Sequence, residues 1–313
     1  MALLARTLAL LAMAVVTVAI KVVPLDMAQD SFDDQYRGCG PAMTKAFPAL
    51  YKFEFQKNPL FAKTWVKAEA EWRKRGSHVF PLASPAQAVA VMAYTMKDIY
   101  NGFNKAVRAA GLSRQEYQNN FHFKTLHFLL TQALVTLRQA QNGQCRHVFR
   151  GVRDIHFQAR RGQRVRFGQF TSTSPRKEIA LRFGTDTIFQ VQTCHGVDIR
   201  QFSMYPTEEE VLIPPFETFH VTQVIWDGKR TQIWLRSAGT FSKYNCAQCC
   251  GDGPCHSLNP CHPWLPPWHS LTPPNPCHRQ AHHDTSYIPG LHTPPPPTLC
   301  HLSPHGPHLS RHP

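Results

Sequence analysis

Three consecutive glutamates stand directly before a short apolar run in the second half of the sequence. Glu208, Glu209 and Glu210 lie in "SMYPTEEEVLIPPFETF", where the Val-Leu-Ile run of residues 211–213 reads as a buried strand that two prolines end. Like charges side by side repel one another, and the whole chain has only 20 acidic residues. A solvated turn is the simplest explanation of the cluster, so the remaining sequence must decide whether these carboxylates do chemistry.

Two further polar features stand in strand-like stretches earlier in the chain. Arg150 interrupts the otherwise apolar "HVFRGV" (residues 147–152), and a buried guanidinium needs carboxylate or phosphate partners. Taken alone, it is more simply a structural salt bridge than a ligand contact. Hydroxyl groups cluster in "GQFTSTS" (residues 168–174), which taken alone is only a turn that ends a strand.

The charge of the chain is unevenly distributed. It has 313 residues and a formal net charge of +14, and the excess lies in residues 1–250, because residues 251–313 hold two basic and two acidic side chains. A basic folded domain suggests an anionic ligand or partner. The one dense basic stretch, "RRGQRVRFGQF" (Arg160 to Phe170), alternates as a half-exposed strand does, and no DNA- or RNA-binding signature is visible. We therefore expect no nucleic-acid partner.

The N-terminus has the features of a secretory signal peptide. Arg6 precedes the apolar stretch Leu8–Ile20, which has small residues near its end. The stretch is too short to span a bilayer comfortably, and the C-terminal end carries no GPI-anchor signal. We expect a signal peptide over residues 1–20 and a secreted protein without a stable membrane anchor. An N-terminal anchor and the ER lumen are the alternatives.

Secretion makes the ten cysteines interpretable, because it permits disulfides. Four of them lie within or at the edge of the region expected to be ordered: Cys39, Cys145, Cys194 and Cys246. An even number in an oxidising compartment suggests two bridges, for which three pairings are open.

Periodicity divides the expected domain into a helical and a β-rich half. Apolar residues recur at spacings of three and four between about residues 41 and 142, with Ser84-Pro85 fitting a helix start and Gly111 a stop. Short β-rich stretches separated by turn residues follow from residue 147 to about residue 237. Helices first and strands second is the pattern of an α+β domain, and we interpret residues 26–250 as one unit.

The composition changes sharply at about Cys249. Residues 251–313 are rich in proline, histidine and scattered cysteine without periodicity, so they cannot bury enough apolar surface to offset their ordering entropy. Zinc or copper binding is the functional alternative, but the spacings lack paired ligand motifs of fixed length. We predict a disordered tail and no metal site.

The three polar features in this order resemble the arginine–serine–glutamate signature of the ADP-ribosyltransferases. "FRG", "FTSTS" and above all "EEEVLIPP" look like the vertebrate ecto-enzymes that modify arginine, especially the avian ones. "SFDDQYRGC", "QTCHGV" and "QIWLRS" extend the likeness over roughly residues 24–250. The resemblance implies a catalytic domain over residues 21–250, with a helical N-terminal half packed on a mixed β-sheet or β-sandwich core.

The resemblance also implies a reaction and a role for each residue. NAD, with NADP as an alternative, would donate ADP-ribose to arginine with release of nicotinamide. Arg150 would hold the phosphates and ribose of NAD, Ser172 would bond near the nicotinamide ribose, and Glu210 would stabilise the oxocarbenium-like transition state. Glu208 would orient the acceptor guanidinium. If residues 208–210 are extended, Glu208 and Glu210 share a face and Glu209 points away.

Weaker implications concern other NAD contacts. Tyr94, Gln169 and Ser203 match further contact positions of the family. Ser174 competes with Ser172 for the serine role, although the spacing to the last glutamate favours Ser172. Phe183 either stacks on nicotinamide or belongs to the core.

The family likewise implies the pairings Cys39–Cys246 and Cys145–Cys194. The expected partners are arginine-containing proteins and small guanidino acceptors, and we expect a monomer. Two alternatives remain: an NAD glycohydrolase on the same fold, which the Glu at 208 disfavours, and a catalytically silent secreted protein that binds anionic surfaces.

Overall fold

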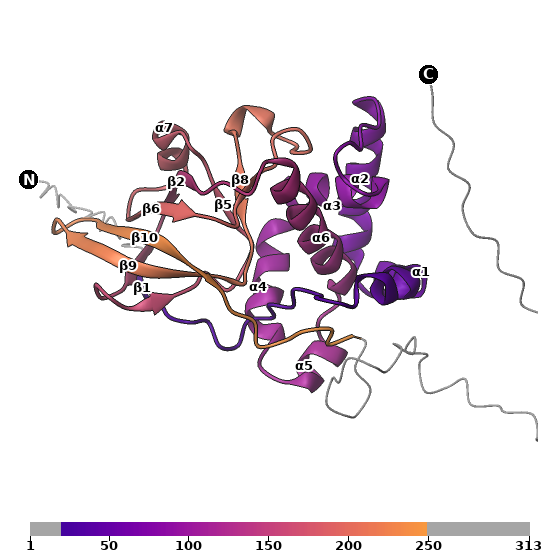
Figure 1. Cartoon of the computed structure of the whole chain (residues 1–313), viewed down its shortest axis with the longest axis horizontal. Helices are drawn as coiled ribbons and strands as arrows, with labels where there is room; N and C mark the ends of the chain where they lie inside the picture. The colour runs from indigo at the N-terminus through magenta and orange to yellow at the C-terminus, as the bar shows by residue number, and fades with distance from the viewer. Residues whose placement is uncertain (1–19, 249–313) are drawn as a thin grey trace, which may run out of the picture. The chain divides into compact units, whose positions relative to one another are not determined.

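The computed structural model describes residues 20–248, so the predicted signal peptide and the predicted Pro/His-rich tail lie outside the described residues. Within this part of the chain the helices come first and the strands second (Figure 1). No helix in this part is long and apolar enough to cross a membrane.

Six helices form the first half, and Ser84 starts one of them as predicted, since its side chain accepts a hydrogen bond from the Gln87 amide. The stretch between Ser84 and Gly111 is divided into two helices rather than one. The helices are α1 (Gly40–Lys57), α2 (Pro59–Lys74), α3 (Pro85–Thr95), α4 (Tyr100–Ala110), α5 (Arg114–Asn119) and α6 (Lys124–Ala140).

Two of these helices form the centre of the helical half. In α3, eight of the 11 residues are buried, and in α6 eleven of the 17 are buried, so both are covered on nearly every side. They pack on each other, and α6 also contacts the small sheet described next. Helix α3 therefore holds its side chains in fixed positions between the other helices and the strands.

The strands form two antiparallel or mixed sheets and a short parallel pair. The larger sheet has the order β2-β6-β10-β9-β4, the smaller one β5-β8-β7, and β1 pairs with β3. The elements are β1 (Lys21–Pro24), β2 (Arg146–Val152), β3 (Ile155–Gln158), β4 (Arg164–Val165), β5 (Thr171–Thr173), α7 (Lys177–Ala180), η1 (Leu181–Phe183), β6 (Thr187–Thr193), β7 (Val197–Asp198), η2 (Pro206–Glu208), β8 (Val211–Ile213), β9 (Glu217–Trp226) and β10 (Thr231–Thr240). Because β10 runs parallel to β6 and antiparallel to β9, the larger sheet is mixed, as expected.

Strand β8 lies between two hydrophobic cores. Leu212 packs in the core that the helices share with the small sheet, whereas Val211 and Ile213 pack in a second core with the larger sheet. Alternate side chains of a strand point to opposite faces, so a strand covered on both faces is apolar throughout. This layered arrangement confirms the predicted α+β class with a helical half packed on a sandwich-like core.

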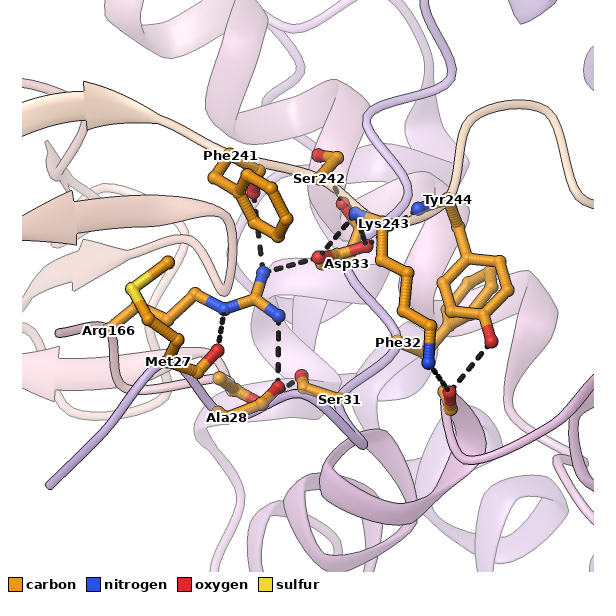
Figure 2. Close-up of polar contacts among 12 residues, drawn as sticks. Met27, Ala28, Ser31, Phe32, Asp33, Arg166, Phe241, Ser242, Lys243 and Tyr244 are labelled. Carbon is orange, nitrogen blue, oxygen red and sulfur yellow. Dashed lines mark hydrogen bonds and ion pairs between the residues drawn. The ribbon is translucent and has the colours of Figure 1, made fainter. Parts of the chain in front are cut away.

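Both disulfides implied by the resemblance are present. Cys39 is bonded to Cys246, and Cys145 to Cys194. Beside the first bridge, the carboxylate of Asp33 accepts hydrogen bonds from the Arg166 guanidinium and from the backbone of residues 243 and 244 (Figure 2). The N-terminal segment is thereby bound to the last described residues of the chain.

Candidate active site

A pair of backbone hydrogen bonds between the two sheets places Arg150 against Ser172. Phe149 of β2 and Ser174 exchange two backbone hydrogen bonds, of 2.8 and 3.0 Å, which hold β2 beside β5. The next residue, Arg150, donates from Nη1 to the Ser172 carbonyl at 2.7 Å. Burial lowers the pKa of Arg150, while nearby groups that include Glu210 raise it. These contacts therefore hold a partly buried guanidinium beside the predicted serine.

Glu210 stands directly before β8, the strand that pairs with β5, where Ser172 lies. Its side chain is only 6 % exposed, and within residues 20–248 its buried Oε1 atom has no hydrogen-bond partner. Burial raises the pKa of Glu210 to about 7; a hydrogen bond from Ser172 and the charge of Arg150 lower it, and Glu208 raises it further. The ionised form of this carboxylate is therefore only partly compensated by the residues that surround it.

The expected extended conformation of the three glutamates is wrong. Glu208 ends the short helix η2, and Glu209 adopts the left-handed conformation, with φ 48° and ψ 48°. The three glutamate side chains therefore point in different directions because of a tight turn, and not because they alternate along a strand. Glu209 still points away from Glu210, because its carboxylate pairs with Arg176 at 3.4 Å and with Arg200 at 3.5 Å.

Glu208 lines an open pocket of about 320 Å³. Burial raises the pKa of Glu208, and the charge of Lys97 lowers it. Phe183 lines the same pocket and is 55 % exposed, so the interpretation of Phe183 as a core residue is wrong. An aromatic side chain and a carboxylate thus border one opening, two residues along the chain from Glu210.

Ser174 is already engaged in holding this turn together. Its hydroxyl donates to the Glu208 carbonyl at 2.9 Å and accepts from the Arg176 amide at 3.2 Å. Ser172, in contrast, faces Glu210 and Tyr94. The geometry therefore favours Ser172 over Ser174 for contact with a ligand.

Tyr94 approaches the site from helix α3. Its hydroxyl donates to the Phe170 carbonyl at 3.0 Å and lies 3.4 Å from the Ser172 hydroxyl. Asn104 of α4 donates to the Tyr94 hydroxyl at 3.2 Å. Burial raises the pKa of Tyr94, so the phenol stays neutral. The structure brings Tyr94 together with Ser172, Arg150 and Glu210.

Gln169 contacts a residue that the sequence analysis missed. Its side-chain oxygen accepts a hydrogen bond from the guanidinium of Arg108 in α4. Burial and the positive charge of Arg150 lower the pKa of Arg108, so the two arginines face the same region. The sequence did offer one signal for this helix. Asn104 lies on the buried, apolar face of α4, and a buried polar side chain needs a hydrogen-bond partner. Arg108 follows Asn104 by four residues on the same helix.

Ser203 is used within its own loop. It is fully buried, its hydroxyl accepts from the Tyr205 amide at 3.0 Å, and its carbonyl accepts from Arg75 at 2.9 Å. These contacts shape the segment before η2 rather than joining Ser203 to Ser172 or Arg150.

The assembled groups suit one kind of ligand. Two guanidinium groups can bind the negative charges of a pyrophosphate, and neutral hydroxyl groups can form hydrogen bonds with a ribose. A buried carboxylate can stabilise a positive charge that develops next to them. No cluster of metal-binding side chains occurs in residues 20–248. The fold and these side chains together are those expected of an ADP-ribosyltransferase.

Comparison with known proteins agrees with this class. Residues 25–243 match the family model described as NAD:arginine ADP-ribosyltransferase, and the chain belongs to this family. It is 52 % identical over 227 residues to NAD(P)(+)--arginine ADP-ribosyltransferase 2 of Gallus gallus, covering 72 % of each chain. It is 46 % identical over 253 residues to GPI-linked NAD(P)(+)--arginine ADP-ribosyltransferase 1 of Mus musculus, covering 74 % of this chain and 76 % of the relative.

Among solved structures, the chain resembles a mutant of the eukaryotic mono-ADP-ribosyltransferase ART2.2 in complex with NAD. The TM-score is 0.62 and the identity 36 %, over 72 % of this chain and 98 % of the other. The likeness confirms the predicted fold.

Proposed function

We propose that the protein transfers ADP-ribose from NAD to the guanidinium group of arginine side chains and releases nicotinamide. The observation that carries this proposal is the buried Glu210 carboxylate, unpartnered at Oε1 within the described residues and in contact with Ser172. The names of the relatives, which are NAD(P)(+)--arginine ADP-ribosyltransferases, support the same reaction.

Binding of NAD falls to the residues beside Glu210. Arg150 and Arg108 would hold the pyrophosphate, since two guanidinium groups offset its two negative charges. Tyr94 and Ser172 would bond the nicotinamide ribose, and Gln169 would fix Arg108. NADP, which has one more phosphate, is the alternative donor.

Glu210 would act on the bond that breaks. As the bond between ribose C1′ and the nicotinamide nitrogen lengthens, nicotinamide leaves with the electron pair and positive charge develops on the ribose. A carboxylate fixed in a water-poor site stabilises this charge at little reorganisation cost. Glu210 must be ionised to do this, and the nearby positive charge of bound nicotinamide-ribose favours the ionised form.

Glu208 would serve the second half of the reaction. A guanidinium nitrogen of the acceptor forms the new bond to C1′, and a proton must leave that nitrogen. Glu208 lies at the open pocket beside Glu210, and its raised pKa suits it both to bind the guanidinium and to take the proton. Phe183 would cover the acceptor or nicotinamide from the other side of the pocket.

The disulfides and the relatives of the chain bear on where the enzyme acts. We propose that it acts on arginines of proteins outside the cell, where two disulfides are stable. The mouse relative is GPI-linked, whereas secretion without an anchor remains our prediction for this chain.

A direct test is incubation of the secreted protein with labelled NAD, with and without agmatine as a guanidino acceptor. The proposal predicts ADP-ribosyl-agmatine and nicotinamide in equal amounts. Nicotinamide with free ADP-ribose alone would instead identify an NAD glycohydrolase, and no turnover would identify a silent binding protein.

A further inference from the structure

A pocket of about 750 Å³ lies apart from the catalytic residues, between β1, β3 and the end of β9. We call its surroundings the β1–β9 face. Its lining combines apolar side chains, among them Val22, Phe157 and Trp226, with polar ones such as His156 and Arg160. Figure 1 shows β1 and β9 on the side of the sheets that faces away from helices α1–α3. None of the candidate active-site residues lines this pocket.

Large apolar side chains on this face are open to water. Val22 and Trp226 are each 55 % exposed, although both border the pocket. The Trp226 ring stands edge-on to His156, with centroids 4.9 Å apart, which fixes its orientation. Clustered exposed apolar residues on a monomer mark interaction surfaces, and tryptophan is enriched where one end of a side chain is apolar and the other wet.

Free cations surround the apolar residues. Lys21 begins β1, Arg160 lines the pocket and Arg161 follows it, and all three are exposed. Within residues 20–248, none of them forms an ion pair. Acidic residues lie there too: Asp227 is paired with Arg230 at 3.5 Å, the Asp154 carbonyl accepts from the Lys21 amide at 3.0 Å, and the Asp186 carboxylate accepts from the Asp154 amide at 2.9 Å. The three cations that form no ion pair in the described part of the chain give the edge of the pocket exposed positive charge, which complements an anionic surface.

We propose that the β1–β9 face docks on an anionic phospholipid bilayer. Trp226 and Val22 enter the headgroup region, while Lys21, Arg160 and Arg161 contact lipid phosphates. A sulfated glycan would satisfy the cations but leave the apolar side chains in water, so the bilayer accounts for both features. This inference is independent of the proposed reaction, because it uses none of the catalytic residues.

The test uses the secreted full chain and sedimentation with phosphatidylcholine vesicles, with or without phosphatidylserine. We expect binding that requires phosphatidylserine and weakens with salt. Arg160→Gln and Arg161→Gln should each weaken it about fivefold, as one cation near an anionic membrane does. Val22→Ser should weaken it further, whereas Val66→Ser on α2, which replaces a valine that is also 55 % exposed, should not. NAD turnover of all variants reports that they are folded.

Three results would overturn the proposal. The first is vesicle binding that is absent or that Val22→Ser and Val66→Ser change equally. The second is retention on heparin that Arg160→Gln weakens, without vesicle binding. The third is a dimer in sedimentation velocity that Val22→Ser dissociates, because the face would then bind a second copy of the chain.

Discussion

At the scale of single residues, Glu210 has two opposing effects on the protein. Burial raises its pKa to about 7, whereas the role in bond breaking that we propose for Glu210 needs the ionised carboxylate. A raised pKa in the folded state means that the native protein binds more protons than the unfolded one between pH 4.5 and 7. The contribution of Glu210 to stability is therefore complete below about pH 4.5 and is lost as the pH rises through 7.

Replacing Glu210 by Gln should stabilise the protein at alkaline pH. Removing the buried charge should raise the free energy of unfolding at pH 8 by up to about 3 kcal/mol, because burial raises the pKa of Glu210 from 4.5 to about 7, and change it little at pH 4.5. Urea unfolding at both pH values measures this. Glu209→Gln is the matched control, since Glu209 is ion-paired at the surface. Equal effects of the two variants at both pH values would show that Glu210 is not buried as a costly charge.

At the scale of elements, the site is made by the contacts between β2, β5 and the turn before β8. Ser174 joins all three, through its backbone to Phe149 and through its hydroxyl to the Glu208 carbonyl. Arg150, Ser172, Glu208 and Glu210, to which we assign the chemistry, all lie within two residues of these shared hydrogen bonds. A small displacement of the turn would move Glu208 relative to Glu210.

Ser174→Ala should impair transfer to agmatine more than hydrolysis of NAD. The variant loses the hydrogen bond to the Glu208 carbonyl, which should also cost about 1 kcal/mol of stability. Thr173→Val is a matched control, because it removes a 2.6 Å bond to the Val211 carbonyl but leaves the turn of Glu208 bonded. The ratio of the two products, measured with both variants, checks the prediction; an unchanged ratio in Ser174→Ala would contradict it.

Local sequence patterns predicted most of the elements but not the conformation of the glutamates. Helix α3 begins at Ser84-Pro85 because these residues cap a helix in any context, and the β-rich stretches became strands because their apolar period matches two buried faces. The left-handed Glu209 could not be predicted, since only its ion pairs and the turn around it select that conformation. Arg108 was missed because its neighbours in space come from another part of the chain.

At the scale of the whole molecule, the two ends of the described chain are fastened together. Asp33 accepts hydrogen bonds from Arg166 and from the backbone of residues 243 and 244 (Figure 2). Asp34 accepts hydrogen bonds from the backbone of residues 246 and 247. Arg166 also donates to the carbonyls of residues 27, 28 and 241. Arg166 lies three residues before Gln169 and six before Ser172. The hydrogen bonds of Arg166 therefore also help to fix the position of this part of the candidate site.

Asp33→Asn should destabilise the protein by about 3–5 kcal/mol, because it leaves the fully buried Arg166 without its counter-charge. Asp98→Asn is the control: Asp98 pairs with Lys67 at 2.7 Å, but both side chains are about half exposed, so we expect a much smaller loss. Thermal unfolding of both variants measures the difference. Similar losses of stability in the two variants would show that burial does not make the Asp33–Arg166 pair more important for stability than an exposed pair.

The tail predicted for residues 251–313 should contribute nothing to this unit. A chain that stops after residue 250 should keep its melting temperature and its rate of NAD turnover, since the predicted tail has no apolar core to supply. Loss of most of the activity, or zinc bound in stoichiometric amount to the full chain, would contradict the prediction.

The most direct test of the central claim is to measure both products, ADP-ribosyl-agmatine and free ADP-ribose, for Glu210→Gln and Glu208→Gln. Glu210→Gln should reduce both by about two to three orders of magnitude, because both reactions share the breaking of the nicotinamide–ribose bond. Glu208→Gln should abolish transfer while hydrolysis persists or rises, since water needs no partner for a guanidinium. If both variants lose both products in the same proportion, Glu208 and Glu210 do not have separate roles, and the account of the site is wrong.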